Sequence, residues 1–158
     1  MGYYFIDKYS LLHFGVGILW NYIGLDLISL IILHTLFELV ENTKIGIRFI
    51  NNYLTLWPGG KEHPDSIVNS VSDIIFSVLG WIFYRKYVGK IGKSELGIFG
   101  LTISLFFWLS DKQIFILFLL VCLLFMVIGR KRYIIYVVIG LIISYIVNFI
   151  DNKLELFS

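Results

Sequence analysis

The chain has 158 residues, 58% of them hydrophobic and 15% charged, and its mean hydropathy is +0.85. A soluble domain of this length could not bury so much apolar surface, so the composition excludes an ordinary soluble protein. The net charge of +2 is too small to indicate nucleic-acid binding, and the basic residues stand at the ends of apolar segments. The single cysteine, Cys122, lies within an apolar run, which excludes a disulfide framework.

Apolar runs separated by short charged segments are typical of a polytopic membrane protein. We therefore predict an all-α, polytopic transmembrane helix bundle that forms one integral membrane domain over residues 1–158. A spanning helix needs about 20 mainly apolar residues. About six spans are expected, or five if one hairpin is re-entrant: 9–24, 27–42, 66–86, 95–110, 112–129 and 133–150. The first three are expected to form a polar-lined core, and the last three to be peripheral.

Residues 44–57, between the second and third predicted spans, have a different pattern. The apolar residues on one side of a helical wheel are Ile47, Ile50, Leu54 and Trp57. The polar residues on the other side are Lys44, Arg48, Asn51, Asn52 and Thr55. This periodicity predicts an amphipathic helix that lies in the membrane interface. Asp26 is expected to cap the second span, and Asp65 or Ser66 to cap the third.

Basic residues are densest in two of the short loops on one side of the predicted bundle. They are Arg85, Lys86, Lys90, Lys93, Arg130, Lys131 and Arg132. Positive charge in short loops favours the cytoplasmic side of a membrane. We therefore expect both termini and the 43–65 loop to be extracytoplasmic.

Three predicted spans carry polar side chains within otherwise apolar sequence. These are His13 in the first, His34, Glu38 and Glu41 in the second, and Ser66, Asn69, Ser70 and Asp73 in the third. His34, Glu38 and Glu41 share one helix face. With a rise of about 1.5 Å per residue, the three groups lie at similar depths beneath the same membrane face. Ionisable groups are costly in hydrocarbon, so they are expected to meet in one pocket.

The motifs DKYSLLHF (7–14), ENT (41–43) and DSIVNSVSDIIFSVLGW (65–81) carry a family resemblance. They resemble the VanZ-like small bacterial membrane proteins and a related bacterial membrane family with an ENT…DSxxNSxxD signature. The resemblance covers residues 7–82. The chain departs from the VanZ pattern at Glu41–Asn42, where a Glu-x-x-Gln helix would end. The resemblance implies a bacterial membrane protein of a group associated with glycopeptide-antibiotic resistance, for which no reaction is agreed.

Two kinds of site fit the polar residues. One is a divalent metal site, such as a zinc site, with the ligands His13, His34, Glu38 and Asp73, and with Glu41 or His63 as further candidates. In a metal-free variant of this site, Glu38 and Asp73 are the central acid–base pair, and His13 and His34 exchange protons with them.

The other kind of site recognises the head group of a membrane lipid or lipid-linked molecule. Its expected substrate contacts are Lys44, Arg48, Asn69, Ser66 and Glu41. Whether the chain is an enzyme stays open. In the alternative hypothesis the chain is a non-enzymatic accessory subunit, and its polar network only holds helices together. The expected partners are membrane lipid, and also other membrane proteins or further copies of the chain, but not nucleic acid.

Overall fold

The computed structural model describes residues 4–54, 60–107 and 111–155, and within these ranges the chain is all-helical, with no strand. The helices are α1 (Lys8–Tyr22), α2 (Leu27–Glu41), α3 (Lys44–Tyr53), α4 (Ile67–Ile91), α5 (Lys93–Phe106), α6 (Asp111–Val127) and α7 (Arg132–Glu155). The all-α prediction is confirmed. Thr55 and Trp57 of the predicted interfacial helix, and residues 108–110 of the fourth predicted span, lie outside the described residues.

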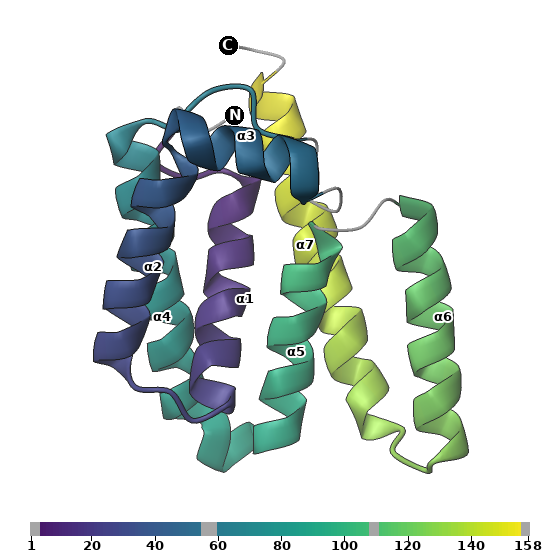
Figure 1. Cartoon of the computed structure of the whole chain (residues 1–158). Coiled ribbons are helices and arrows are strands. Elements are labelled where there is room, and N and C mark those ends of the chain that lie inside the picture. The colour runs from purple at the N-terminus through teal and green to yellow at the C-terminus, as the bar shows by residue number, and fades with distance from the viewer. Residues whose placement is uncertain (1–3, 55–59, 108–110, 156–158) are drawn as a thin grey trace.

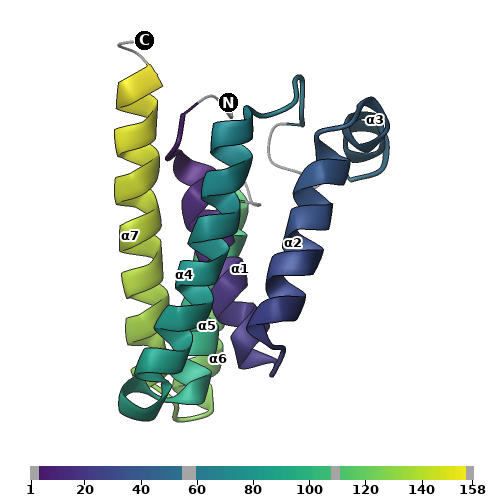
Figure 2. The same ribbon diagram turned by 90° about the vertical axis from the view of Figure 1, so that its left-hand side faces the viewer.

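The described helices other than α3 run side by side along one direction, and α3 lies across one end of them (Figure 1). The chain passes back and forth, so the start of α1, the end of α7 and the segment before α4 share the end covered by α3. α1 is central and packs mainly against α4 and α5, while α5 also packs against α7. Figure 2 shows α2 standing away from α1, with α7 on the opposite side of the bundle.

Polar side chains mark the starts of the first four helices. Asp7, Asp26, Thr43 and Ser66 are the N-cap residues of α1, α2, α3 and α4, and each accepts a hydrogen bond from a backbone N–H of the first turn. At α1 Asp7 and Ser10 cap each other. Asp7 Oδ1 accepts from the backbone N–H of Ser10, and Ser10 Oγ accepts from the backbone N–H of Asp7. Such caps satisfy amides that the helix itself leaves without partners.

Small residues let the backbones of α1 and α4 come into contact. A Cβ atom added to Gly17 would overlap the carbonyl group of Ser77, and one added to Gly80 would overlap that of Phe14. Because only hydrogen occupies these positions, the two helices are in direct backbone contact. This contact fixes the position of His13, which lies one turn before Gly17 on α1.

The outer surface of the bundle is strongly apolar. Ile28 on α2 is 70% exposed and Val127 on α6 is 77% exposed, and most of the exposed large hydrophobic residues lie on α2, α4, α6 and α7. The accessible surface is 9847 Å², whereas a soluble monomer of 18.4 kDa exposes about 8,200 Å². An exposed apolar surface of this extent indicates contact with a membrane or with a partner protein.

A helix occupies each of the six predicted spans, but the helices differ in length. Two segments, Ile67–Ile91 and Arg132–Lys153, are long and apolar enough to cross a membrane. Gln113–Val127 is apolar but shorter. The helices α1, α2 and α5 contain 15, 15 and 14 residues, fewer than the roughly 20 residues of a typical span.

Candidate functional site

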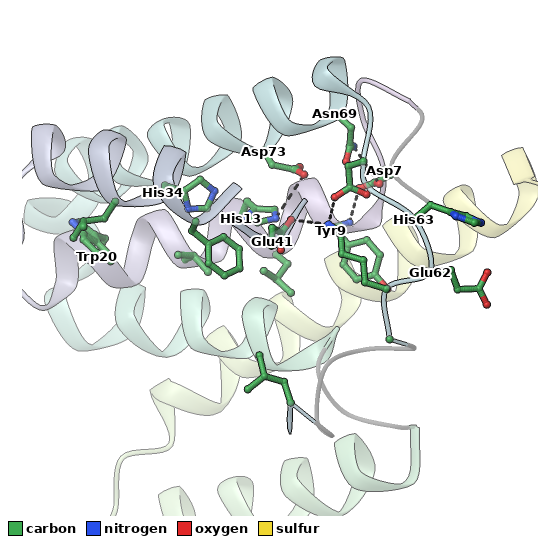
Figure 3. Close-up of a pocket in the computed structure, with 18 residues that line it drawn as sticks. Asp7, Tyr9, His13, Trp20, His34, Glu41, Glu62, His63, Asn69 and Asp73 are labelled. Carbon is green, nitrogen blue, oxygen red and sulfur yellow. Dashed lines mark hydrogen bonds and ion pairs between the residues drawn. The ribbon is translucent and has the colours of Figure 1, made fainter. Parts of the chain in front are cut away.

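A cavity of about 710 Å³ lies between α1, α2, α4 and the segment 60–65. In Figure 3 Trp20 lies at one end of it, Glu62 and His63 lie at the other, and His34, His13 and Asp73 lie between them. Leu33 and Val16 add to the apolar lining. The cavity therefore has polar and apolar parts, and its ionisable groups come from both the helical region and the 60–65 segment.

Four buried side chains, His13, His34, Glu38 and Asp73, form what we call the His/Glu cluster. His13 Nε2 lies 3.7 Å from Asp73 Oδ2 and 3.9 Å from Glu38 Oε1. His34 Nε2 lies 3.5 Å from the same Glu38 oxygen, and the two imidazole rings pack edge to face with centroids 4.8 Å apart. The structure thus brings together the four residues that the sequence suggested as ligands or acid–base groups.

Glu38 is the most buried carboxylate of the His/Glu cluster, with 2% of its surface exposed. Among the described residues neither of its carboxylate oxygens has a hydrogen-bond partner, and His34 Nε2 also lacks one. His34 and Glu38 lie one turn apart on α2 and share one face of the helix, and of the two only His34 is a lining residue of the cavity. A buried carboxylate without hydrogen bonds is costly unless a proton or a cation neutralises it.

Asp73 and Asn69 also connect α4 to α1. Ser10 Oγ donates to Asp73 Oδ1 at 3.2 Å. The amide nitrogen of Asn69 donates to the carbonyl of Tyr4 at 3.0 Å and to Asp7 Oδ2 at 3.3 Å. These bonds use both amide hydrogens of Asn69, which therefore holds α1 against α4. Burial raises the pKa of Asp7, although hydrogen bonds from the α1 backbone and from Asn69 oppose the shift.

Lys61 is a cavity residue that sequence reasoning missed. Its ammonium group lies 2.8 Å from Glu41 Oε1 and also donates to Asp65. Asn51 fixes the Lys61 backbone, because its amide group donates to the Lys61 carbonyl and accepts from the Lys61 N–H, each at 2.8 Å. Burial lowers the pKa of Lys61, but Glu41 and Asp65 raise it by more, so it stands above its usual 10.5.

Lys44 and Arg48, the predicted anion contacts on α3, are not among the residues that line the cavity. Both side chains are exposed. The inward face of α3 consists instead of Gly46, which packs against the carbonyl of Val40, and Ile50, which is 3% exposed. The close contact at Gly46 determines which face of α3 turns inward, and it leaves the two cations outside.

The other predicted site residues lie outside the His/Glu cluster. Ser66 caps α4 and accepts from the Asn69 backbone N–H at 3.1 Å, and it is not part of the cavity lining. Glu41 lines the cavity but is paired with Lys61. His63 lines the polar end and is exposed.

Acidic groups outnumber basic ones around the cavity. Its lining contains the carboxylates Asp7, Glu41, Glu62, Asp65 and Asp73, and Lys61 is the only lysine or arginine among the described lining residues. A site of this charge attracts cations and repels a free anion. The nearest ligand atoms of His13, His34 and Glu38 lie within 4.8 Å of one another, which is close enough for one metal ion.

Comparison of the chain with protein-family models, with curated proteins and with solved structures gives no match. The functional argument therefore depends on the residues and their geometry.

Proposed function

We propose that the chain is an integral membrane protein that binds the polar head group of a membrane lipid or lipid-linked molecule in the cavity between α1, α2 and α4. The observation that carries this proposal is the arrangement of the lining. Trp20 and Leu33 offer apolar surface, and the polar groups in the same cavity come from His13, His34, Lys61, Asp65 and Asp73. An amphiphile needs both kinds of lining in one site.

The membrane assignment is supported by the exposed apolar surface and by the back-and-forth course of six helices. The basic residues of the 85–93 and 130–132 segments lie at the end of the bundle opposite α3. By the positive-inside rule that end is cytoplasmic. The termini, α3 and the polar end of the cavity then face the extracytoplasmic side, where α3 lies in the interface.

The resemblance of residues 7–82 to the VanZ-like group supports a role at the cell envelope. The residues that carry it include His13, Asn69 and Asp73, all of which line the cavity. In our proposal Glu38 and Asp73 are the central acid–base or ligand pair, and His13 and His34 are their partners. These groups suit either binding or proton transfer to a bound head group.

A second function, that of an accessory subunit with a purely structural polar network, is favoured by one observation. Asp73 and Asn69 already make hydrogen bonds to Ser10, Tyr4 and Asp7 that join α4 to α1. That account does not extend to Glu38, whose carboxylate joins no hydrogen-bonded network among the described residues.

The test is lipid retention by purified protein in nanodiscs, with a photoactivatable phospholipid and a polyprenyl phosphate as probes. We expect Glu38→Gln and Asp73→Asn to fold and to lose at least about tenfold in crosslinking. Glu62→Gln, an exposed carboxylate of the same lining, is the matched control and should crosslink like the wild type. Equal crosslinking by all variants, or losses that follow thermal stability, would establish the structural role instead.

A further inference from the structure

We propose that His13, His34 and Glu38 bind one divalent transition-metal ion, for which Zn²⁺ is the best fit. The ion would join α1 to α2 inside the bundle. The inference deepens the proposed function, because it concerns the same cavity and explains how an acidic cavity could hold an anionic head group. Metal content is measurable without any lipid, so the two proposals can fail separately.

Distances within the His/Glu cluster fit shared coordination better than direct hydrogen bonding. The separations of 3.5 Å from His34 Nε2 to Glu38 and 3.9 Å from His13 Nε2 to Glu38 exceed the 2.7–3.2 Å typical of hydrogen bonds. Ligand bonds of about 2.0–2.2 Å in a tetrahedron place the ligand atoms about 3.3–3.6 Å apart. The His34–Glu38 separation lies in this range, the His13–Glu38 separation is 3.9 Å, and all three ligand atoms are within 4.8 Å of one another, so a modest inward movement of His13 would complete the three-ligand set.

The unpartnered atoms form a second, independent observation. Glu38 is 98% buried, and among the described residues both its oxygens and His34 Nε2 lack hydrogen-bond partners. Two of these atoms, Glu38 Oε1 and His34 Nε2, are the ones that the distances place beside the proposed ion. A cation would neutralise the Glu38 carboxylate and give His34 Nε2 a partner, whereas packing alone leaves both groups without one.

The donor set indicates the class of metal. Two imidazole nitrogens and one carboxylate oxygen suit zinc, and also iron or manganese. Calcium and magnesium prefer sites made of oxygen alone. Two histidines with one glutamate are also a ligand set of catalytic zinc sites, in which a fourth position stays open for water or substrate.

We propose one ion and not two, because a lysine already neutralises the carboxylates of the second candidate group. Glu38, Glu41 and Asp65 also have ligand atoms within 4.8 Å of one another. The ammonium group of Lys61, however, contacts both Glu41 and Asp65. Lys61 therefore supplies the positive charge there, and a second metal ion would be repelled by it.

Asp73 lies beside the proposed ion without belonging to the three-ligand set. Ser10 holds its Oδ1, and its Oδ2 points toward His13 at 3.7 Å. His13, His34 and Asp73 all line the cavity, so the open coordination position faces the space where a head group would lie. An oxygen of that head group, or a water molecule, is the ligand expected there.

The test is metal analysis of full-length protein purified without chelators and with a tag that contains no histidine. We expect close to one zinc ion per chain, or the same occupancy by Co²⁺ after exchange. Glu38→Gln and His34→Asn should each reduce the metal content at least about tenfold. His63→Asn, the matched histidine control at the exposed polar end, should keep it.

X-ray absorption of the loaded wild type keeps the proposal testable if the variants fail to fold. It should show nitrogen and oxygen ligands, including two imidazoles. Absence of bound metal in the wild type after exposure to Zn²⁺ and Co²⁺, retention by Glu38→Gln and His34→Asn, or a sulfur ligand would each overturn the inference. Loss of lipid crosslinking with metal retained would overturn the head-group proposal alone.

Discussion

The ammonium nitrogen of Lys61 lies 2.8 Å from Oε1 of Glu41, and both side chains are buried. Glu41 is the last residue of α2, whereas Lys61 belongs to the segment that precedes α4. The ion pair therefore joins two parts of the chain that cover the same end of the cavity. Removing one partner of a buried pair leaves the other charge uncompensated, which costs more than the pair itself contributes.

We expect Lys61→Met to lower the free energy of unfolding by about 3 kcal/mol, because Glu41 and Asp65 are left facing each other without a cation. The corresponding drop in the thermal midpoint is about 6–12 °C, measured by circular dichroism in detergent. Lys44→Met removes an exposed lysine from α3 and serves as the control. Equal midpoints for the two variants would mean that the Lys61–Glu41 pair contributes no stability.

The stabilisation by Lys61 should depend on pH in one direction. Its folded-state pKa is raised above 10.5, so the charged form is favoured by folding. The contribution is therefore fully present below the unfolded pKa of about 10.4, and it is lost as the pH rises through the higher folded pKa. The difference in unfolding free energy between wild type and Lys61→Met should be constant from about pH 8 to 9.5 and shrink above about pH 11. A difference that grows with pH would contradict this assignment.

Two glycines of α4 should respond oppositely to the same substitution. Gly80→Ala places a methyl group against the Phe14 carbonyl and should destabilise the protein by about 1–3 kcal/mol. Gly89 has open space around its Cβ position, so Gly89→Ala should stabilise the helix by about 0.5–1 kcal/mol. Thermal unfolding of the two variants under one condition makes the comparison. Destabilisation of both would show that alanine is disfavoured in α4 for some other reason.

Filling the apolar part of the cavity should separate lipid binding from metal binding. Val16→Phe adds bulk to the α1 wall, and we expect it to reduce lipid crosslinking by about tenfold or more. Metal content should not change, because Val16 supplies none of the ligand atoms. Leu39→Phe, on the exposed outer face of α2, is the control. Normal crosslinking by Val16→Phe would remove Val16 from the binding site.

Helical periodicity allowed much of the His/Glu cluster to be predicted from sequence. His34 and Glu38 must share a face because they are one turn apart, and His13 and Asp73 fall at matching depths on their own helices. The N-cap roles of Asp26 and Ser66 also follow from local chemistry. These features depend only on nearby residues.

The position of Lys61 and the orientation of α3 depend on contacts between distant residues. Asn51 holds the Lys61 backbone across ten residues, and Asn42 accepts from the Asp65 N–H across 23. No periodic pattern reports such bonds. The α3 sequence also has a second apolar edge, Ile45 and Phe49, that is exposed, so amphipathicity alone could not tell which edge turns inward.

Helix ends were the least predictable part of the fold. α4 continues to Ile91, beyond the predicted end at residue 86. Arg85, Lys86 and Lys90 are hydrophilic, but they are also good helix formers, so the helix extends past the apolar stretch. A hydropathy pattern marks where an apolar segment ends, whereas backbone hydrogen bonding decides where a helix ends.

The two helices that supply both histidines, α1 and α2, are each 15 residues long, which corresponds to about 22 Å. The hydrocarbon layer of a bilayer is about 30 Å thick. In the membrane position that we propose, this mismatch beside the 25-residue α4 would be relieved if the adjacent leaflets thin locally. Phospholipids next to α2 would then sit deeper than their neighbours, which shortens the path that a head group travels to reach His34 and favours entry from the side.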